Sequence, residues 1–143
     1  MIVMNFIKNR LGPLLAFGAT LAMAPMLSAN ETTPRQTLKQ ELNYLSYSIQ
    51  PLLPMVIDDS TQLIAAQAST DTFIRTFKIF VPLTEIDTHA FTVAMQPALT
   101  SYVCDTENQK PLLELGGKHQ FVYLAMPAEI FADITIDQAQ CDR

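Results

Sequence analysis

The sequence predicts an α+β domain, and three patterns support this prediction. Apolar residues recur at helical spacing in two segments, they alternate at strand spacing in two others, and the chain holds only two cysteines. We therefore expect an antiparallel sheet of about four strands, with an N-terminal helix and a middle helical segment packed on one face and a single disulfide. The expected order is helix, two strands, helix, short helix and two strands.

The first thirty residues have the layout of a secretory signal peptide. Lys8 and Arg10 precede an apolar run at 11–27, and the small residue Ala29 offers a cleavage position. At about 17 residues the run is at the lower limit of a bilayer span, so a cleaved signal is favoured over a retained anchor. We expect a signal peptide at 1–29, one exported domain at 30–143, and a periplasmic or secreted location.

The expected helices follow from apolar stripes. At 31–50, capping residues at 33–36 precede a stripe formed by Leu38, Leu42, Leu45 and Ile49. Tyr44 and Tyr47 flank this stripe, and we expect them to pack at the core margin rather than to stack on a ligand. The middle helix is expected at 87–104, where Pro97 should kink or restart it.

A short helix at 110–115 is expected to end at Gly116 and Gly117, one of which can adopt the left-handed conformation of a helix cap. The two acids Asp58 and Asp59 lie in the connection before the first strand. They lack the spaced oxygen ligands and the glycine bend of a calcium loop, so a turn is the favoured interpretation.

Four strands are expected at 61–68, 72–81, 120–126 and 130–137. The first of them could equally be helical, because three alanines weaken its strand pattern. The last two should form a hairpin. In the last strand, strict alternation predicts that Ile130, Ala132, Ile134 and Ile136 point inward, and that Phe131, Asp133, Thr135 and Asp137 point outward.

Composition and charge exclude several classes of partner. The chain has a net charge of −5, and removal of 1–29 with its two cations would leave 7 cations against 14 acids, a net charge of −7. Such a surface repels phosphate backbones and anionic lipid, so we expect no nucleic-acid partner. No cysteine precedes Cys104, so no lipid anchor is expected, and a membrane is a partner only if the signal segment stays uncleaved.

The two cysteines, Cys104 and Cys141, are expected to form a structural disulfide. An exported protein meets an oxidising compartment, and the two residues lack the C-x-x-C spacing of a redox motif. The bond would join the end of the middle helix to the C-terminal tail.

The sequence contains no recognisable catalytic or cofactor motif. His89 and His119 lie in different elements without a second metal ligand at helical or turn spacing, and His119 is interpreted as a solvated strand end. There is no G-x-S-x-G motif or phosphate-binding glycine loop. Ser101, His89 and an aspartate are the residue types of a catalytic triad, but any sequence of this size contains such a set. We expect no metal and no cofactor.

By elimination, the sequence favours a small non-enzymatic domain that binds another envelope or secreted protein. The candidate roles are an envelope-assembly partner, a chaperone-like module and an immunity protein, and the alternative is a small secreted hydrolase with a site assembled across the sheet. Pilotin-type secretion accessories are also small and disulfide-linked, but they are typically lipoproteins, so the missing early cysteine counts against that role.

The expected contact surface is the C-terminal hairpin. Its outward residues would be Phe131, Asp133, Thr135 and Asp137, and the aromatics Phe80 and Tyr123 are further candidates for exposure. Because the domain is acidic, its partner should present a basic rim.

Overall fold

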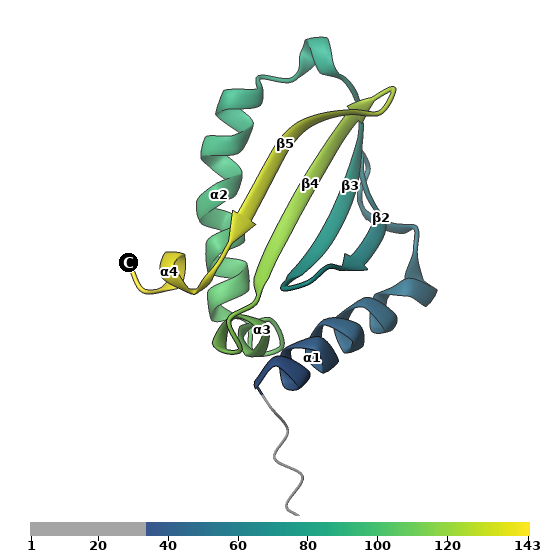
Figure 1. Ribbon diagram of the computed structural model, residues 1–143. Helices are drawn as coiled ribbons and strands as arrows, with labels where there is room; N and C mark the ends of the chain where they lie inside the picture. The colour runs from purple at the N-terminus through teal and green to yellow at the C-terminus, as the bar shows by residue number, and fades with distance from the viewer. Residues whose placement is uncertain (1–33) are drawn as a thin grey trace, which may run out of the picture. The chain divides into compact units, whose positions relative to one another are not determined.

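The computed structural model describes residues 34–143, so the predicted signal peptide at 1–29 and the cap at Thr33 lie outside the described residues. The described chain forms a five-stranded sheet with the spatial order β1-β2-β3-β4-β5 and four helices (Figure 1). The predicted α+β class is confirmed. The helices are α1 Pro34–Ile49, α2 Thr88–Asp105, α3 Lys110–Glu114 and α4 Gln138–Cys141, and the strands are β1 Met55–Asp58, β2 Thr61–Ala68, β3 Thr72–Pro82, β4 Lys118–Met126 and β5 Glu129–Ile136.

The sheet is mixed, whereas the sequence predicted an antiparallel one. Strands β3 and β4 run parallel, and every other neighbouring pair is antiparallel. The reason is the long connection through α2 and α3, which returns the chain to the end of the sheet where β3 began, as parallel pairing requires. The expected hairpin of β4 and β5 is confirmed.

The sequence also missed strand β1. Its four residues follow two prolines and pair only with Thr61–Leu63 of β2. The turn predicted at the acidic pair is confirmed, because Asp58 ends β1 and its side chain accepts hydrogen bonds from the backbone N–H of Ser60 at 2.8 Å and from the Ser60 hydroxyl at 3.0 Å. These bonds hold the pKa of the exposed Asp58 carboxyl below its usual range.

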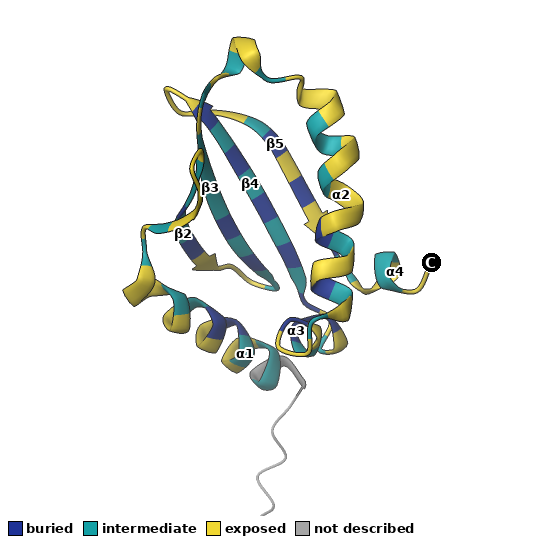
Figure 2. Ribbon diagram, turned by 180° about the vertical axis from the view of Figure 1, so that it is seen from behind, coloured by how far each residue is buried: buried dark blue, intermediate teal, exposed yellow. Residues whose placement is uncertain are grey.

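Helices α1, α2 and α3 pack against one face of the sheet, which we call the covered face. Strand residues on this face alternate with less buried ones along β3, β4 and β5 (Figure 2). One core cluster lies beneath α2 and is formed by Leu99, Val103, Leu113, Phe121, Tyr123, Ala132, Ile134 and Ile136. A second lies beneath α1 and α3 and is formed by Leu42, Leu45, Ala66, Phe73 and Leu112.

The helix ends follow their local sequence. The side chain of Asp87 caps α2 by accepting from the N–H of Ala90 at 2.9 Å, and α2 continues as one helix through Pro97. Gly116 has φ of 82° and so provides the left-handed cap expected after α3. Among the described residues, no helix is both long and apolar enough to span a membrane.

Candidate protein-binding surface

The face of the sheet opposite the helices, which we call the open face, carries the strand residues that point away from the core. The ladder of β4 and β5 places Gln120 beside Thr135, and Val122 beside Asp133. Both carboxylate oxygens of Asp133 lie 2.9 Å from Nε2 of Gln120, which donates to them. The predicted outward orientation of Asp133 and Thr135 is confirmed, because both side chains are exposed.

Phe131 does not point outward, and the prediction for this residue is wrong. The register changes from Tyr123 opposite Ala132 to Leu124 opposite Ile130, so Phe131 is the extra residue of a β-bulge. Its ring lies on the covered face, 5.0 Å from the ring centroid of Phe91 and 6.3 Å from that of Tyr123. The bulge therefore buries part of an aromatic ring that strict alternation would have left in solvent.

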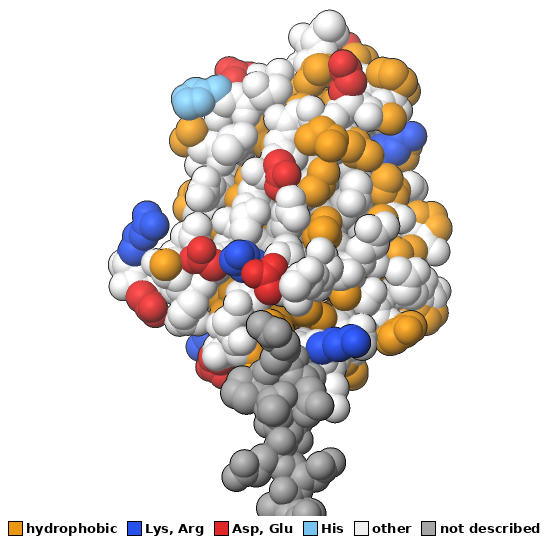
Figure 3. All heavy atoms as spheres, in the orientation of Figure 1, with side chains coloured by type: hydrophobic (Ala, Val, Ile, Leu, Met, Phe, Trp, Pro, Cys, Tyr) orange, Lys and Arg blue, Asp and Glu red, His pale blue; other side chains and the backbone are white. Residues whose placement is uncertain are grey.

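The same bulge moves Ile130 to the open face, although the sequence predicted that it points inward. Ile130 is 65% exposed, as is Val56 of β1. It neighbours Leu124 across the ladder, and the exposed residues Phe80 and Met126 lie at the same end of the sheet. Val56 on β1 also lies at this end, separated from Leu124 by Gln62 and Lys78. We call these five residues the apolar end of the open face, and hydrophobic side chains gather over it in Figure 3.

Charged groups border the open face. Lys78 lies over the ring of Phe80, with its Nζ 5.2 Å from the ring centroid. At the opposite end of the face, Nζ of Lys118 lies 3.0 Å from a carboxylate oxygen of Asp71. The hydroxyl of Thr72, and after it Lys118, hold the pKa of the Asp71 carboxyl below its usual range.

Asp137, the fourth predicted contact residue, serves a structural role at the end of β5. Its side chain accepts from the N–H of Ala139 at 2.9 Å, and its own N–H donates to Oε1 of Gln140 at 2.7 Å. This capping box begins α4. Of the other aromatics considered, Phe80 is 43% exposed, whereas Tyr123 is 4% exposed and belongs to the core.

A buried cluster on the covered face was missed by the sequence interpretation. The side chain of Arg75 is 4% exposed and that of His119 is fully buried, so His119 is not a solvated strand end. The guanidinium carbon of Arg75 lies 4.3 Å from the ring centroid of Phe121 and 5.5 Å from that of Tyr102. The cation is thus held by aromatic faces, and no carboxylate pairs with it among residues 34–143.

Hydrogen bonds show which nitrogen of the His119 ring carries the proton. Nε2 of His119 lies 3.0 Å from the carbonyl oxygen of Gln109, which can only accept, so Nε2 carries the proton. Nδ1 then accepts from Nη2 of Arg75 at 2.9 Å. Burial, and next the charge of Arg75, lower the pKa of His119 to about 4. The imidazole therefore stays neutral at physiological pH and joins Arg75 on β3 to the loop before α3.

The alternation of side chains along a strand could have revealed this cluster. Arg75 lies between Phe73 and Phe77 at strand spacing, and His119 lies two residues before Phe121. Both polar residues therefore share a face with aromatic core residues, and alternation alone predicts that they point inward.

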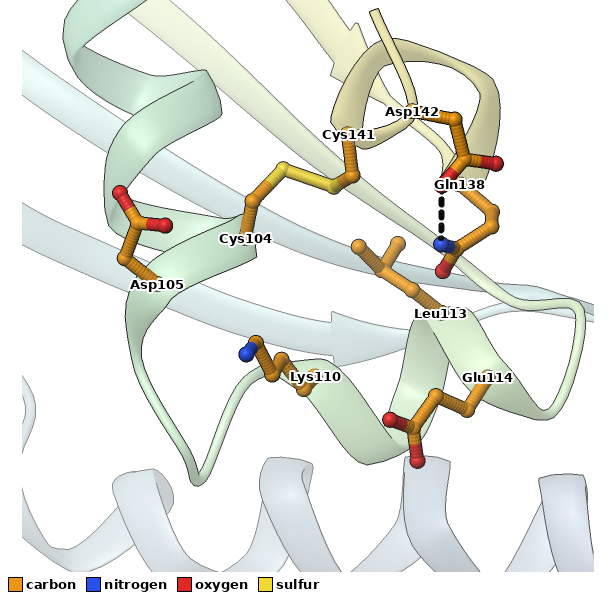
Figure 4. Close-up of a pocket in the computed structure, with 8 residues that line it drawn as sticks. All are labelled: Cys104, Asp105, Lys110, Leu113, Glu114, Gln138, Cys141 and Asp142. Carbon is orange, nitrogen blue, oxygen red and sulfur yellow. Dashed lines mark hydrogen bonds between the residues drawn. A yellow bond between two sulfur atoms is a disulfide. The ribbon is translucent and has the colours of Figure 1, made fainter.

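The predicted disulfide between Cys104 and Cys141 is confirmed, with the two Cα atoms 5.5 Å apart. The bond joins α2 to α4 and lies beside a pocket of about 340 Å³ (Figure 4). The acids Asp105, Glu114 and Asp142 and the cation Lys110 surround this pocket. No group of three or more histidine, cysteine or acidic residues within 34–143 is arranged to hold a metal ion.

The structure does not assemble the triad considered above. His89 and Ser101 both lie on α2, and their sequence separation of twelve corresponds to about 18 Å along a helix. The hydroxyl of Ser101 instead donates to a carboxylate oxygen of Asp105 at 2.6 Å. Ser101 therefore has no histidine base within reach.

Comparison with known proteins identifies a shared fold and no sequence family. No protein-family model and no curated protein matches the chain. A candidate secreted protein from Pseudomonas aeruginosa superposes with a TM-score of 0.67 at 14% identity, covering 76% of this chain and 96% of that one.

Two pilotins have the same fold. The type II secretion system pilotin AspS from Vibrio cholerae superposes with a TM-score of 0.57 at 14% identity, over 76% of this chain and 95% of that one. The pilotin EpsS of the Vibrio vulnificus type 2 secretion system superposes with a TM-score of 0.57 at 13% identity, over 74% of this chain and 96% of that one. This chain therefore has a fold that is also found in a candidate secreted protein and in two secretion-system pilotins.

Proposed function

We propose that this protein is an exported, non-enzymatic accessory domain that binds another envelope protein through the open face of the β4–β5 hairpin. The observation that carries the proposal is the exposure of Ile130, which a β-bulge turns out of the core beside Leu124. Exposed apolar groups that cluster with polar neighbours are typical of protein contact sites.

The charges around the β4–β5 hairpin indicate which charges a partner would carry. Glu129 precedes Ile130 in the hairpin, and Asp133 lies on the same open face further along β5. The chain as a whole is acidic, with a net charge of −5. A partner with an apolar centre and a basic rim would complement this surface, and salt would then slow association.

The fold comparison favours one of the roles that the sequence left open. Two of the similar structures are pilotins of type II secretion systems. Envelope assembly is therefore preferred over a chaperone-like or an immunity role. The described residues provide no observation that favours the hydrolase alternative.

Export with cleavage after Ala29 is part of this proposal. We expect the N-terminus of the exported protein to be Asn30, because the two cations, the apolar run and the small residue occur in the required order. N-terminal sequencing of protein recovered from the periplasm or medium measures this. Recovery of a membrane-held chain that still begins at Met1 would contradict cleavage and favour an anchor.

Ile130→Asp should abolish binding of the partner. The substitution places a charge at the centre of the apolar end, where burial against another protein would desolvate it. Affinity capture from envelope extract, followed by mass spectrometry, should lose one specific protein with this variant. The fold should remain, because Ile130 is 65% exposed.

The matched control is Val93→Asp. Val93 is 60% exposed on α2, so the substitution makes the same change of charge and a similar change of polarity away from the open face. The captured protein should be retained by this control. Equal loss with both variants, or equal retention with both, would contradict the assignment of the binding surface.

A further inference from the structure

The edge of the sheet at β1 is exposed and unpaired. Strand β1 is the first strand in the spatial order, and no strand lies beyond it among residues 34–143. Three of its four residues are exposed, Val56, Ile57 and Asp58, so no other element of the described chain covers this edge. The backbone groups on the outer side of β1 are therefore available to another strand.

Apolar side chains gather around this edge. The 3₁₀ turn η1 Gln50–Leu52 leads from α1 into β1, and Tyr47 near the end of α1 lies beside Ala66 of β2, on the same side of the sheet. Five large side chains of this region are between 51% and 72% exposed. We call them the β1 flank: Tyr44, Tyr47, Leu52, Val56 and Ile57. Figure 3 shows hydrophobic side chains along the side of the molecule beyond β2.

The two tyrosines are more exposed than the sequence predicted. Packing at the core margin would cover much of each ring, yet Tyr44 is 68% and Tyr47 72% exposed. Both lie on the side of α1 away from the buried residues Leu42 and Leu45. Their rings therefore extend the apolar surface of the β1 flank.

The β1 flank carries no charge, although the chain is acidic. No lysine, arginine, aspartate or glutamate occurs between Glu41 and Asp58, whereas the net charge of the chain is −5. Two copies of an acidic domain repel each other where their charged surfaces meet, so an uncharged surface is the one through which they can associate.

The position of the acids favours an antiparallel pair of β1 strands. Asp58 and Asp59 follow directly at the end of β1. In a two-fold antiparallel pair, the acids of the two copies lie at opposite ends of the paired strands. A parallel pair would place like charges directly opposite one another, which is destabilising.

The same features disfavour a lipid surface as the occupant. An unpaired strand edge in hydrocarbon would leave backbone N–H and C=O groups without partners. The available area suits a small protein interface. Two copies that bury the five side chains and the strand edge would remove on the order of 1,200 Å² from water, the lower end of the range for specific interfaces.

We propose that two copies of this chain associate through the β1 flank, with their β1 strands paired antiparallel about a two-fold axis. Backbone hydrogen bonds join the two sheets, and Leu52 and Tyr47 of each copy pack near Ile57 of the second copy. Each copy presents the same surface, as a closed two-fold pair requires. Val56 also belongs to the apolar end of the open face, so pairing brings the open faces of two copies together. The proposal does not rest on the function proposed for that face.

Sedimentation velocity of the purified exported protein tests this proposal. From about 1 μM to about 1 mM we expect a monomer–dimer equilibrium with a dissociation constant on the order of micromolar, as suits a small interface. Ile57→Lys should weaken the dimer at least about tenfold, because a lysine on an edge strand opposes pairing. Val93→Lys is the matched control at a 60% exposed position on α2 and should leave the equilibrium unchanged.

Two further variants and one exchange measurement make the test specific. Leu52→Asp lies outside β1 and should also weaken the dimer, whereas Ile130→Asp should not, which separates this interface from partner binding at the β4–β5 hairpin. Amide exchange at 55–58 should slow with rising concentration in the wild type and not in Ile57→Lys. A monomer at every concentration, a dimer equally sensitive to Val93→Lys, or a dimer whose exchange at 55–58 does not change would overturn the proposal.

Discussion

Replacing both Cys104 and Cys141 by alanine is expected to lower the free energy of unfolding by about 4 kcal/mol, through the entropy of the unfolded chain. The bond closes a loop with a sequence separation of 37 residues. Its loss would remove a large fraction of the stability of a small domain. Denaturant titration monitored by circular dichroism measures the change.

Loss of the disulfide should affect one region of the structure more than the others. α4 has only four residues and is joined to α2 by the disulfide, so amide exchange in 138–141 should accelerate most. A reducing agent should destabilise the wild type and leave the double variant unaffected. If the unfolding midpoint were the same with and without the bond, the assigned stabilising role would be wrong.

The second large effect is a dependence of stability on pH that arises from His119. Its pKa is about 4 in the folded protein, compared with 6.5 for the unperturbed residue. Between these values the unfolded chain binds a proton that the folded chain does not bind. The contribution of His119 to stability should therefore be constant above about pH 6.5 and fall as the pH decreases toward 4, with a total loss on the order of 3 kcal/mol.

His119→Gln should flatten this slope between pH 6.5 and 4. A glutamine amide can still donate toward the carbonyl of Gln109 and accept from Arg75, but it does not titrate. The variant has a lower stability at neutral pH, so the slope, and not the absolute value, is the measurement. His89→Gln, at an exposed position on α2, is the matched control and should keep the slope. An unchanged slope in His119→Gln would contradict the burial of a neutral imidazole.

Sequence periodicity predicted the elements that bury a regular apolar pattern. The strand expected at 61–68 matches β2, and the strand expected at 72–81 matches β3 to within one residue. Strand β1 was missed because it is short and follows Pro51 and Pro54, and because most of its residues are exposed. Such a strand is defined by pairing with a neighbour, which local sequence does not encode.

The candidate surface could be predicted only in part. Alternation correctly placed Asp133 and Thr135, because the register of β5 is regular beyond the bulge. It failed at Ile130 and Phe131, since a single inserted residue reverses the faces of all residues before it. The bulge is favoured by the packing of Phe131 against Phe91, a contact between residues forty positions apart that no local pattern contains.

The buried cluster of Arg75 and His119 could not be predicted in full, for a different reason. Arg75 carries a charge, yet three aromatic rings lie near its guanidinium, on Phe73, Tyr102 and Phe121. Tyr102 comes from α2, and its approach depends on how the helix packs on the sheet. Only the tertiary structure brings these groups together.

Site-specific photo-crosslinking in the intact cell tests the central claim most directly. A photoreactive phenylalanine derivative at position 130 should form a crosslink to one envelope protein, whereas the same residue at position 93, similarly exposed on α2, should not. Mass spectrometry of the adduct identifies the partner and the contact. Crosslinking of the same protein from position 93 alone, or no adduct from position 130 in cells that export the protein, would contradict binding through the open face.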